Sequence, residues 1–278
     1  MAASPLPLSA LIVARNAAAE LGDCLSTLGF AREIVVVLDR TTDGSRAIAE
    51  GFGAKILEGG WPIEGDRREA GIAACTQEWI LEVDADERVT EALAREIGGV
   101  LHGAGPGYFL IPYANHIGGR LIRHGWGAYN GISMKPALFS RGAKRWGRQR
   151  VHPKIELTGE RRRLTQPMLH FVDRDLHDTW DRLNRYSSLQ ARQLRADGRI
   201  GTLAPNLRRM VTRFWKSYVG RRGYREGVYG LVLGLFSALY PILSYLKARA
   251  DEDAGKPLDS RDDSKVRKRT AESESHEC

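Results

Sequence analysis

The sequence is poor in cysteine. Its three cysteines, Cys24, Cys75 and Cys278, are spread over 278 residues without the spacing of a disulfide framework or a metal-binding pair. Such usage fits a reducing compartment. Residues 1–9 also lack the basic stretch and the long apolar core of a secretory signal. Because neither disulfide formation nor secretion is indicated, we expect the protein to stay in the cytoplasm.

Acidic residues are in deficit, with 34 Asp and Glu against 42 Lys and Arg. A basic excess suggests an anionic partner, which could be nucleic acid, an anionic membrane face or a phosphorylated substrate. The sign of the charge alone does not choose among these partners.

Apolar runs and helical patterns alternate in the first part of the chain. Residues 10–14 and 33–39 are typical of strands buried on both faces, and 17–28 between them has apolar residues at helical spacing. Helical and strand patterns continue in turn at 44–53, 54–57, 66–75 and 79–83. This alternation predicts an α/β fold, with a mostly parallel sheet and helices on both faces.

Two carboxylates follow the strand predicted at 79–83. Asp84 and Asp86 are separated by a single residue. Because residues i and i+2 of an extended chain point to the same side, both carboxylates could converge on one divalent cation. A cap for the following helix is the ordinary alternative. Asp39 also ends a predicted strand, and ligands of parallel sheets bind beyond the carboxyl ends of the strands. Two acidic strand ends therefore favour a ligand site at this edge.

After a helical pattern at 90–101, residues 107–159 are strand-like and rich in Gly, Arg and Trp. This composition suits extended segments that line a substrate groove. Trp126 and Trp146 could stack on sugar rings or belong to the core. Residues 175–196 have a helical period with alternating charge and are expected on the surface.

The last third of the chain changes in composition. Residues 208–225 hold seven Arg or Lys residues and no acidic residue, and 227–246 carry no charge over twenty residues. Twenty such residues could cross a bilayer, although glycines and Pro241 weaken a span and tyrosines do not gather at its ends. A basic, aromatic segment before an apolar helix is typical of an element lying in the interface of an anionic membrane. A bilayer span and a buried core helix are the alternatives.

Residues 251–278 are rich in charge and serine, which predicts a disordered tail. We therefore expect an α/β domain over 1–205, a basic and apolar helical region that associates with a membrane over 206–250, and the tail.

Four linked motifs occur at 9–16, 33–45, 67–70 and 79–87. In order and spacing they resemble glycosyltransferase family 2, the inverting nucleotide-sugar transferases with a Rossmann-like GT-A fold. Segments at 123–126, 150–153, 169–171 and 184–186 resemble the lipopolysaccharide-core β-1,4-glucosyltransferase-like branch, whose members act on lipid-linked acceptors at the cytoplasmic membrane face. The likeness covers about residues 8–246.

The resemblance implies a donor site, with a UDP-sugar as the expected donor. Ala14 and Arg15 would flank the nucleotide, and Asp39 would accept a hydrogen bond from an N–H of uracil or guanine. Arg68 would face the diphosphate, and Asp84 would lie near the ribose and the metal. The ordinary alternatives are a helix cap for Asp39 and an exposed helix position for Arg68.

The resemblance also implies a divalent cation, Mg²⁺ or Mn²⁺. Asp86 would bind it directly, and His170 matches a position that can complete the metal shell, with a structural histidine as the alternative. A cation and an arginine would neutralise the charge that develops on the leaving nucleoside diphosphate.

Inversion also requires a general base. The branch usually has Glu after the His of its Val-His segment, and this chain has Pro153 there. The role would fall on His152, on Glu156 or on an acid at Asp173 or Asp175, or the activity is altered. In a regular strand Glu156 points to the opposite side from Pro153.

The leading hypothesis is an inverting, metal-dependent glycosyltransferase that moves a sugar to a lipid-linked or lipopolysaccharide-core saccharide. It would act at the inner face of the cell membrane as a peripheral or integral protein. The alternative is a catalytically degenerate GT-A domain that acts as a membrane-bound scaffold, motivated by Pro153 and by Glu69, where the family commonly has Asn. We expect no nucleic-acid partner, because the basic run adjoins an apolar segment and not a groove-reading module.

Overall fold

The computed structural model describes residues 4–128, 134–149 and 153–253. They form two compact units. Among the described residues, the sheet unit runs to Asp175 apart from His124–Trp126, and the helical unit consists of those three residues and the chain from Leu176 to Asp253. The two compact units divide before the helix Leu176–Ala196, because this helix packs on the last helix of the chain. From residue 254 on, the expected tail lies outside the described residues.

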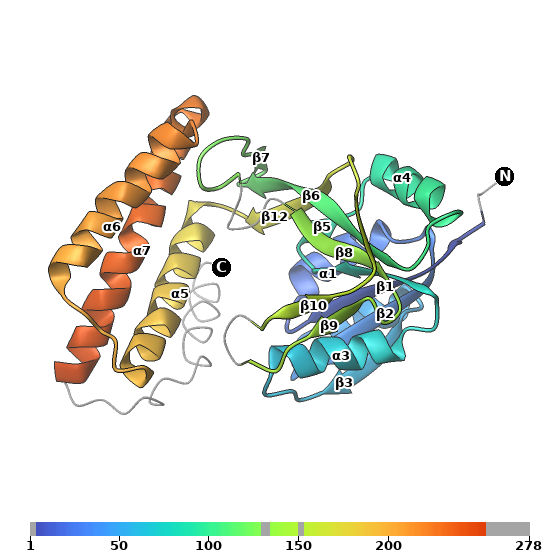
Figure 1. Cartoon of the computed structure of the whole chain (residues 1–278). Helices are drawn as coiled ribbons and strands as arrows, with labels where there is room; N and C mark the ends of the chain where they lie inside the picture. Colours follow the sequence, from blue (N-terminus) through green and yellow to red (C-terminus); the bar gives the residue numbers. More distant parts are fainter. Residues whose placement is uncertain (1–3, 129–133, 150–152, 254–278) are drawn as a thin grey trace, which may run out of the picture. The chain divides into compact units, whose positions relative to one another are not determined.

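The sheet unit contains a ten-stranded sheet (Figure 1). Four neighbouring parallel strands form its first half, in the order β3 (Lys55–Gly59), β2 (Ala31–Asp39), β1 (Leu6–Ala14) and β4 (Trp79–Val83). Because these strands are parallel, their carboxyl ends, including Asp39, meet at one edge.

The second half of the sheet is mixed. It continues from β4 through the antiparallel strand β8 (Met134–Ser140) to β6 (Gly107–Ile117), β12 (Met168–Asp173) and β5 (Glu87–Arg88). β7 (Arg120–Leu121) and β11 (Glu160–Arg163) also pair with β6, whereas β9 (Lys144–Trp146) and β10 (Ile155–Leu157) form a separate two-stranded sheet.

Helices cover both faces of the sheet. Successive residues of β2 point to opposite faces, so Val36 packs in the core cluster of α1 (Ala18–Ser26), α2 (Ser45–Gly51) and α4 (Glu91–Leu101). Val35 and Val37 belong to the cluster on the other face, with α3 (Glu64–Ala74). The predicted α/β class is confirmed, with parallel strands at the amino-terminal end of a mostly parallel sheet and helices on both faces.

α3 approaches the sheet closely at Gly71. A Cβ atom there would lie 2.7 Å from Cδ1 of Leu11 and 2.9 Å from Cγ2 of Val37. Because a larger residue would push the helix away from the sheet, Gly71 helps to set the position of Arg67 and Arg68 on the same helix.

The helical unit consists of α5 (Leu176–Ala196), α6 (Leu203–Trp215), the short turns Lys216–Gly220 and Gly223–Glu226, and α7 (Val228–Asp253). α7 packs on both α5 and α6, which lie beside it in Figure 1. The two short turns join α6 to α7 and are called the hairpin tip below. His124–Trp126 is bound to this tip, where the amide of Gly125 donates to the carbonyl of Arg221 at 2.8 Å and that of Trp126 to Oγ of Ser217 at 3.0 Å.

Among the described residues, one stretch, Val228–Glu252 of α7, is long and apolar enough to cross a membrane. The packing of this helix on its two neighbours buries 44% of its apolar window. Lys247 near its end donates to Oδ1 of Asn184 and Oγ of Ser187 on α5, both at 2.7 Å. The apolar segment is therefore a partner in a helical core as well as a potential membrane element.

Thr90 begins α4, and its Oγ1 accepts a hydrogen bond from the amide of Leu93 at 3.1 Å. The helix-cap alternative for Asp84 and Asp86 is therefore wrong.

We expect Thr90→Ala to lower the free energy of unfolding by about 1 kcal/mol, because an amide of the first turn loses its partner.

Urea denaturation followed by circular dichroism measures this change. The matched control is Thr202→Ala, because Thr202 begins α6 without a side-chain hydrogen bond to the helix. An equal loss of stability in both variants would contradict a specific capping role for Thr90.

Candidate active site

The carboxyl end of β4 leads into a turn that carries both aspartates. It closes where the amide of Glu87 donates to the carbonyl oxygen of Asp84 at 2.9 Å. β5 follows at once and pairs with β12, which places Glu87 opposite His170. The amide of Phe171 donates to the carbonyl oxygen of Asp86 at 2.9 Å. The turn therefore brings Asp86 beside His170.

The carboxylate of Asp84 lies between two cationic side chains. Nη2 of Arg68 is 3.3 Å from Oδ1, and Nζ of Lys135 is 3.1 Å from Oδ2. Burial alone would raise the pKa of Asp84, but Arg68 and Lys135 outweigh it and hold the pKa well below its usual range. Asp84 is therefore a stable anion.

A buried carboxylate beneath Asp84 organises these cations. Glu82 of β4 is 6% exposed and forms ion pairs with Arg68 and Lys144. Burial would raise the pKa of Glu82, and Lys144 and Arg68 reverse this effect and lower it. The guanidinium of Arg68 also lies 4.6 Å from the ring centre of Trp146. Arg68, predicted as a donor ligand, is thus built into a network that links α3, β4 and β9.

Asp86, Glu87 and His170 can each offer one ligand atom, and these atoms lie within 4.8 Å of one another. Nε2 of His170 is 3.5 Å from Oδ2 of Asp86, and its Nδ1 is 2.9 Å from Oδ1 of Asn115. The amide nitrogen of Asn115 donates to the carbonyls of Gly127 and Ala128, which identifies Oδ1 as the atom facing the histidine. Because Oδ1 only accepts, Nδ1 carries a proton, and in the neutral imidazole the lone pair is therefore on Nε2, the nitrogen nearer Asp86. This donor set suits a divalent cation.

Glu87 is a less suitable ligand. Its Oε2 accepts from the amide of Asp84 at 2.9 Å, and its Oε1 accepts from Nζ of Lys135 at 2.8 Å. Burial, together with the neighbouring charge of Asp84, raises the pKa of Glu87 to about 7. Asp86 and His170 are therefore the members of the cluster best placed to bind a metal.

Asp39, at the end of β2, is fully buried and accepts several hydrogen bonds. Its Oδ1 accepts from Nε of Arg40 and from the amide of Trp61, each at 3.0 Å. Its Oδ2 accepts from Arg40 at 2.9 Å and from Nη1 of Arg67 at 3.2 Å. Burial would raise the pKa of Asp39, and these partners lower it instead. The carboxylate binds arginines and does not cap a helix.

Buried polar atoms without partners gather at the same edge. Within the described residues, Oγ1 of Thr41, Nε of Arg67 and Nε1 of Trp146 are buried and have no hydrogen-bond partner. Such atoms are uncommon in folded proteins. They favour a polar ligand at the carboxyl ends of β2 and β4.

Comparison with known proteins agrees with this chemistry. Residues 9–114 match the model of the family described as glycosyl transferase family 2. The lipopolysaccharide core biosynthesis glycosyltransferase LpsC of Rhizobium meliloti is 28% identical over 258 residues, covering 87% of this chain and 92% of the relative. An uncharacterized glycosyltransferase of Rickettsia felis is 24% identical over 87% of this chain and 89% of its own. Residues 9–114 thus resemble glycosyl transferase family 2, and the prediction of a glycosyltransferase is confirmed.

Solved structures resemble the glycosyltransferase over a smaller part of the chain. S. aureus TarS 1-349, in complex with UDP-GlcNAc, is 18% identical with a TM-score of 0.41, over 50% of this chain and 46% of that one. Mannosyl-3-phosphoglycerate synthase from Rubrobacter xylanophilus is 24% identical with a TM-score of 0.35, over 40% of this chain and 41% of that one.

The other predicted site residues have varied positions in the glycosyltransferase. Ala14 is buried at the end of β1, and Arg15 directly after it is exposed. Glu156 is exposed on β10, opposite Arg145 of β9. No hydrogen bond or ion pair of the described residues joins Glu156 to the Asp86 and His170 pair. His152 lies outside the described residues.

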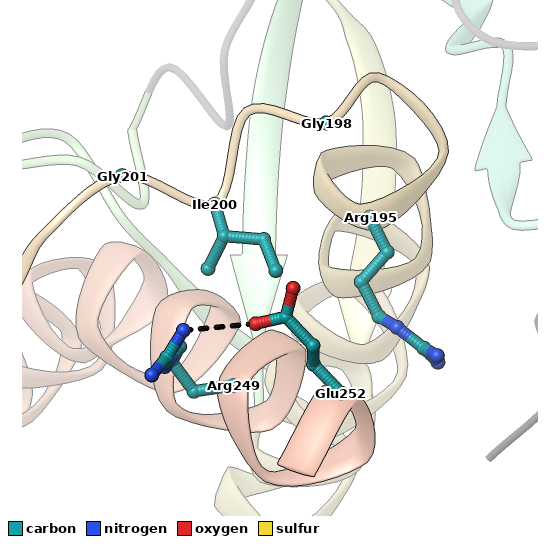
Figure 2. A pocket seen from close by; sticks show the side chains of 6 residues that line it. All are labelled: Arg195, Gly198, Ile200, Gly201, Arg249 and Glu252. Atoms are coloured by element: carbon teal, nitrogen blue, oxygen red, sulfur yellow. Dashed lines mark hydrogen bonds and ion pairs between the residues drawn. The ribbon is translucent and has the colours of Figure 1, made fainter. Parts of the chain in front are cut away.

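A separate hollow of about 340 Å³ lies in the helical unit (Figure 2). Its lining contains none of the predicted site residues and includes an ion pair between Nη1 of Arg249 and Oε2 of Glu252 at 2.9 Å. The full lining is Arg195, Gly198, Ile200, Gly201, Arg249 and Glu252.

Sequence reasoning missed Lys135, Lys144 and Asn115. One signal was present, because Glu82 interrupts a strand that is otherwise apolar and buried on both faces, which requires a buried cationic partner. The sequence did not say which lysine supplies it, since Lys144 is 62 residues away along the chain.

The buried ion pair leads to a stability prediction. Lys144→Met leaves the charge of Glu82 with a single partner, and we expect it to lower the free energy of unfolding by about 3–5 kcal/mol. The double variant Glu82→Gln with Lys144→Met is expected to lose less of this free energy, because the buried charge that lost a partner has been removed as well.

Chemical denaturation of both variants tests this coupling. Lys154→Met is the control for loss of an exposed lysine and is expected to stay within about 0.5 kcal/mol of the wild type. A double variant that is as unstable as Lys144→Met would overturn the charge argument.

Proposed function

We propose that the glycosyltransferase moves a sugar with inversion from a nucleotide-sugar donor, with a UDP-sugar as the expected donor, to a lipid-linked or lipopolysaccharide-core saccharide. The site of transfer would be the inner face of the cell membrane. The observation that carries the donor half is the Asp86 and His170 pair, with the histidine proton held away from the aspartate by Asn115. The relative named for lipopolysaccharide core biosynthesis supports the acceptor class.

In this proposal Asp86 and His170 hold Mg²⁺ or Mn²⁺. A bound divalent cation stabilises negative charge that develops on a leaving diphosphate. The side chain of Asp86 is 40% exposed, so its carboxylate can reach a ligand in solvent. Asn115 keeps the imidazole of His170 in the tautomer that presents Nε2.

Arg68 and Asp84 act together in this proposal. Arg68 is 13% exposed and already pairs with Glu64, Glu82 and Asp84. We propose that it fixes the orientation of Asp84, which then contacts the ribose side of the donor. Ala14 and Arg15 would flank the nucleotide from the end of β1.

The general base is proposed among the residues named from the sequence, His152 and Glu156. The exposure of Glu156 leaves its carboxylate accessible to an acceptor hydroxyl. The alternative of a degenerate scaffold loses one motive, because Oε1 of Glu69 accepts from the amide of Trp146 at 2.6 Å and so has a structural use.

Asp86→Ala is expected to reduce Mn²⁺-dependent hydrolysis of, or transfer from, the preferred nucleotide sugar by about a hundredfold or more. Calorimetric titration with Mn²⁺ in the presence of UDP provides a second readout, in which binding should weaken in parallel. Asp197→Ala, which removes an exposed carboxylate of the helical unit, is the control.

The metal assignment would be contradicted if Asp86→Ala turned over substrate and bound metal as well as the wild type does. A wild-type protein that is silent with every donor and acceptor would instead favour the degenerate scaffold.

Arg40 provides a test of nucleobase recognition by Asp39. A base N–H can reach Asp39 only by replacing a donor already there, and Arg40 is the partner with the greater side-chain exposure, 50% against 23% for Arg67. Because a half-exposed ion pair contributes up to about 1 kcal/mol, we expect Arg40→Ala to bind UDP about two- to fivefold more tightly.

Calorimetric titration with UDP measures this effect, with Arg46→Ala as the control for loss of an exposed, ion-paired arginine. Asp39→Asn is expected to weaken binding. If Arg40→Ala weakens binding as much as Asp39→Asn does, Arg40 itself holds the nucleotide and the displacement model is wrong.

A further inference from the structure

The apolar helix α7 is held inside the helical unit along much of its length. Leu233, Ala238 and Ile242 are buried, and so are the hydroxyl-bearing residues Ser237 and Ser244. At Gly230 the helix runs so close to the hairpin tip that a Cβ atom would lie 1.8 Å from the carbonyl oxygen of Gly223. Crossing a bilayer alone would require α7 to leave these contacts and to expose polar groups to lipid.

α6 and the hairpin tip carry a row of exposed apolar side chains. Along α6, large apolar side chains recur every four residues and face solvent, which makes one continuous ridge. Val211 and Trp215 are its most exposed members, at 62% and 65%. The ridge consists of Leu203, Leu207, Val211, Trp215 and Val219.

Exposed apolar side chains also occur in the hairpin tip and at the start of α7. Val228 is 75% exposed and Tyr224 in the tip is 50% exposed. Leu231 and Leu235, one and two turns further along α7, are also exposed. Solvent-facing apolar groups of this size and continuity mark an interaction surface.

Basic side chains accompany the apolar ridge. Arg208 and Lys216 occupy the helical row beside it, and both are exposed. Other exposed cations are Arg209, Arg222 and Arg225. In the part of the chain that the structure describes, none of these five forms an ion pair. The acidic residue of the tip, Glu226, is buried and accepts from the amide of His124 at 2.9 Å.

We propose that this surface, the ridge of α6 with the hairpin tip and the first turns of α7, docks on an anionic lipid bilayer. The unit would lie in the interface without crossing it. This inference rests on the membrane part of the proposed function and names the surface responsible. Apolar side chains enter the headgroup region while Arg and Lys pair with lipid phosphates, which is the chemistry of interfacial helices.

Charge complementarity selects the bilayer over two other occupants. A second copy of the chain would bring the same cations face to face, and like charges repel. Nucleic acid would pair with the cations but would leave the aliphatic ridge of Leu203, Leu207 and Val211 exposed to water. An anionic bilayer satisfies both features.

The experiment is flotation of the full-length protein with vesicles. We expect binding to vesicles of phosphatidylglycerol and phosphatidylcholine in equal parts, little binding to phosphatidylcholine alone, and release by high salt. Val211→Ser with Trp215→Ser is expected to weaken binding by about tenfold or more, because two large apolar groups no longer enter the interface. Arg208→Gln with Lys216→Gln should also weaken binding and should reduce its salt dependence.

Phe52→Ser is the matched control, because Phe52 is a large apolar residue of the sheet unit, 44% exposed and outside the surface. It should bind vesicles as the wild type does. The thermal unfolding midpoint of each variant must match that of the wild type. The variant Arg208→Gln with Lys216→Gln tests the surface without altering the apolar ridge.

Several results would overturn the proposal. One is that Val211→Ser/Trp215→Ser binds vesicles as well as the wild type does. Another is equal binding of the wild type to neutral and anionic vesicles. A third is bound protein that resists both high salt and alkaline carbonate, which would indicate a bilayer span. A dimer that dissociates when the ridge is mutated would assign the surface to a second copy.

The vesicle assay is independent of the reaction. Asp86→Ala is expected to bind vesicles as the wild type does, so loss of turnover with retained binding counts against the proposed chemistry alone. A wild-type protein that hydrolyses the donor but does not bind vesicles counts against the docking surface alone.

Discussion

The active-site edge depends on a buried charge. Glu82 is buried near the carboxyl end of β4, where both faces of the sheet are covered, and an isolated carboxylate there would be strongly unfavourable. Its ion pairs with Lys144 and Arg68 compensate this burial and connect three separate elements. Arg68 then reaches Asp84, and Lys135 joins Asp84 to Glu87. A change at any of these positions would disturb the turn that carries Asp86.

This network divides the two aspartates by environment. Asp84 lies among cations that keep it charged, whereas Asp86 faces Nε2 of His170 and is 40% exposed. The spacing of the pair suggested a shared cation, because i and i+2 of an extended chain lie on one side. The chain does not stay extended, since it turns after Val83 and starts β5 at Glu87. The turn sends the carboxylates to different partners.

The helical unit shows the limits of composition. An apolar stretch of twenty residues has the same appearance whether it crosses a bilayer, lies on it or fills a core. The packing of α7 on α5 and α6 uses one side of that stretch. On α6, large apolar side chains face solvent in a row beside the basic residues, which the composition of this segment did not indicate.

The sequence by itself determined the elements and their order. The strands at β1, β2 and β4 and the helices between them follow from apolar periodicity, which is a local property, and linked motifs were enough to indicate the family. The tertiary structure alone decided which side chains meet. Lys144 with Glu82, Asn115 with His170 and Arg67 with Asp39 are pairs from distant parts of the chain. Their contacts are set by sheet order and helix packing, and no local pattern encodes them.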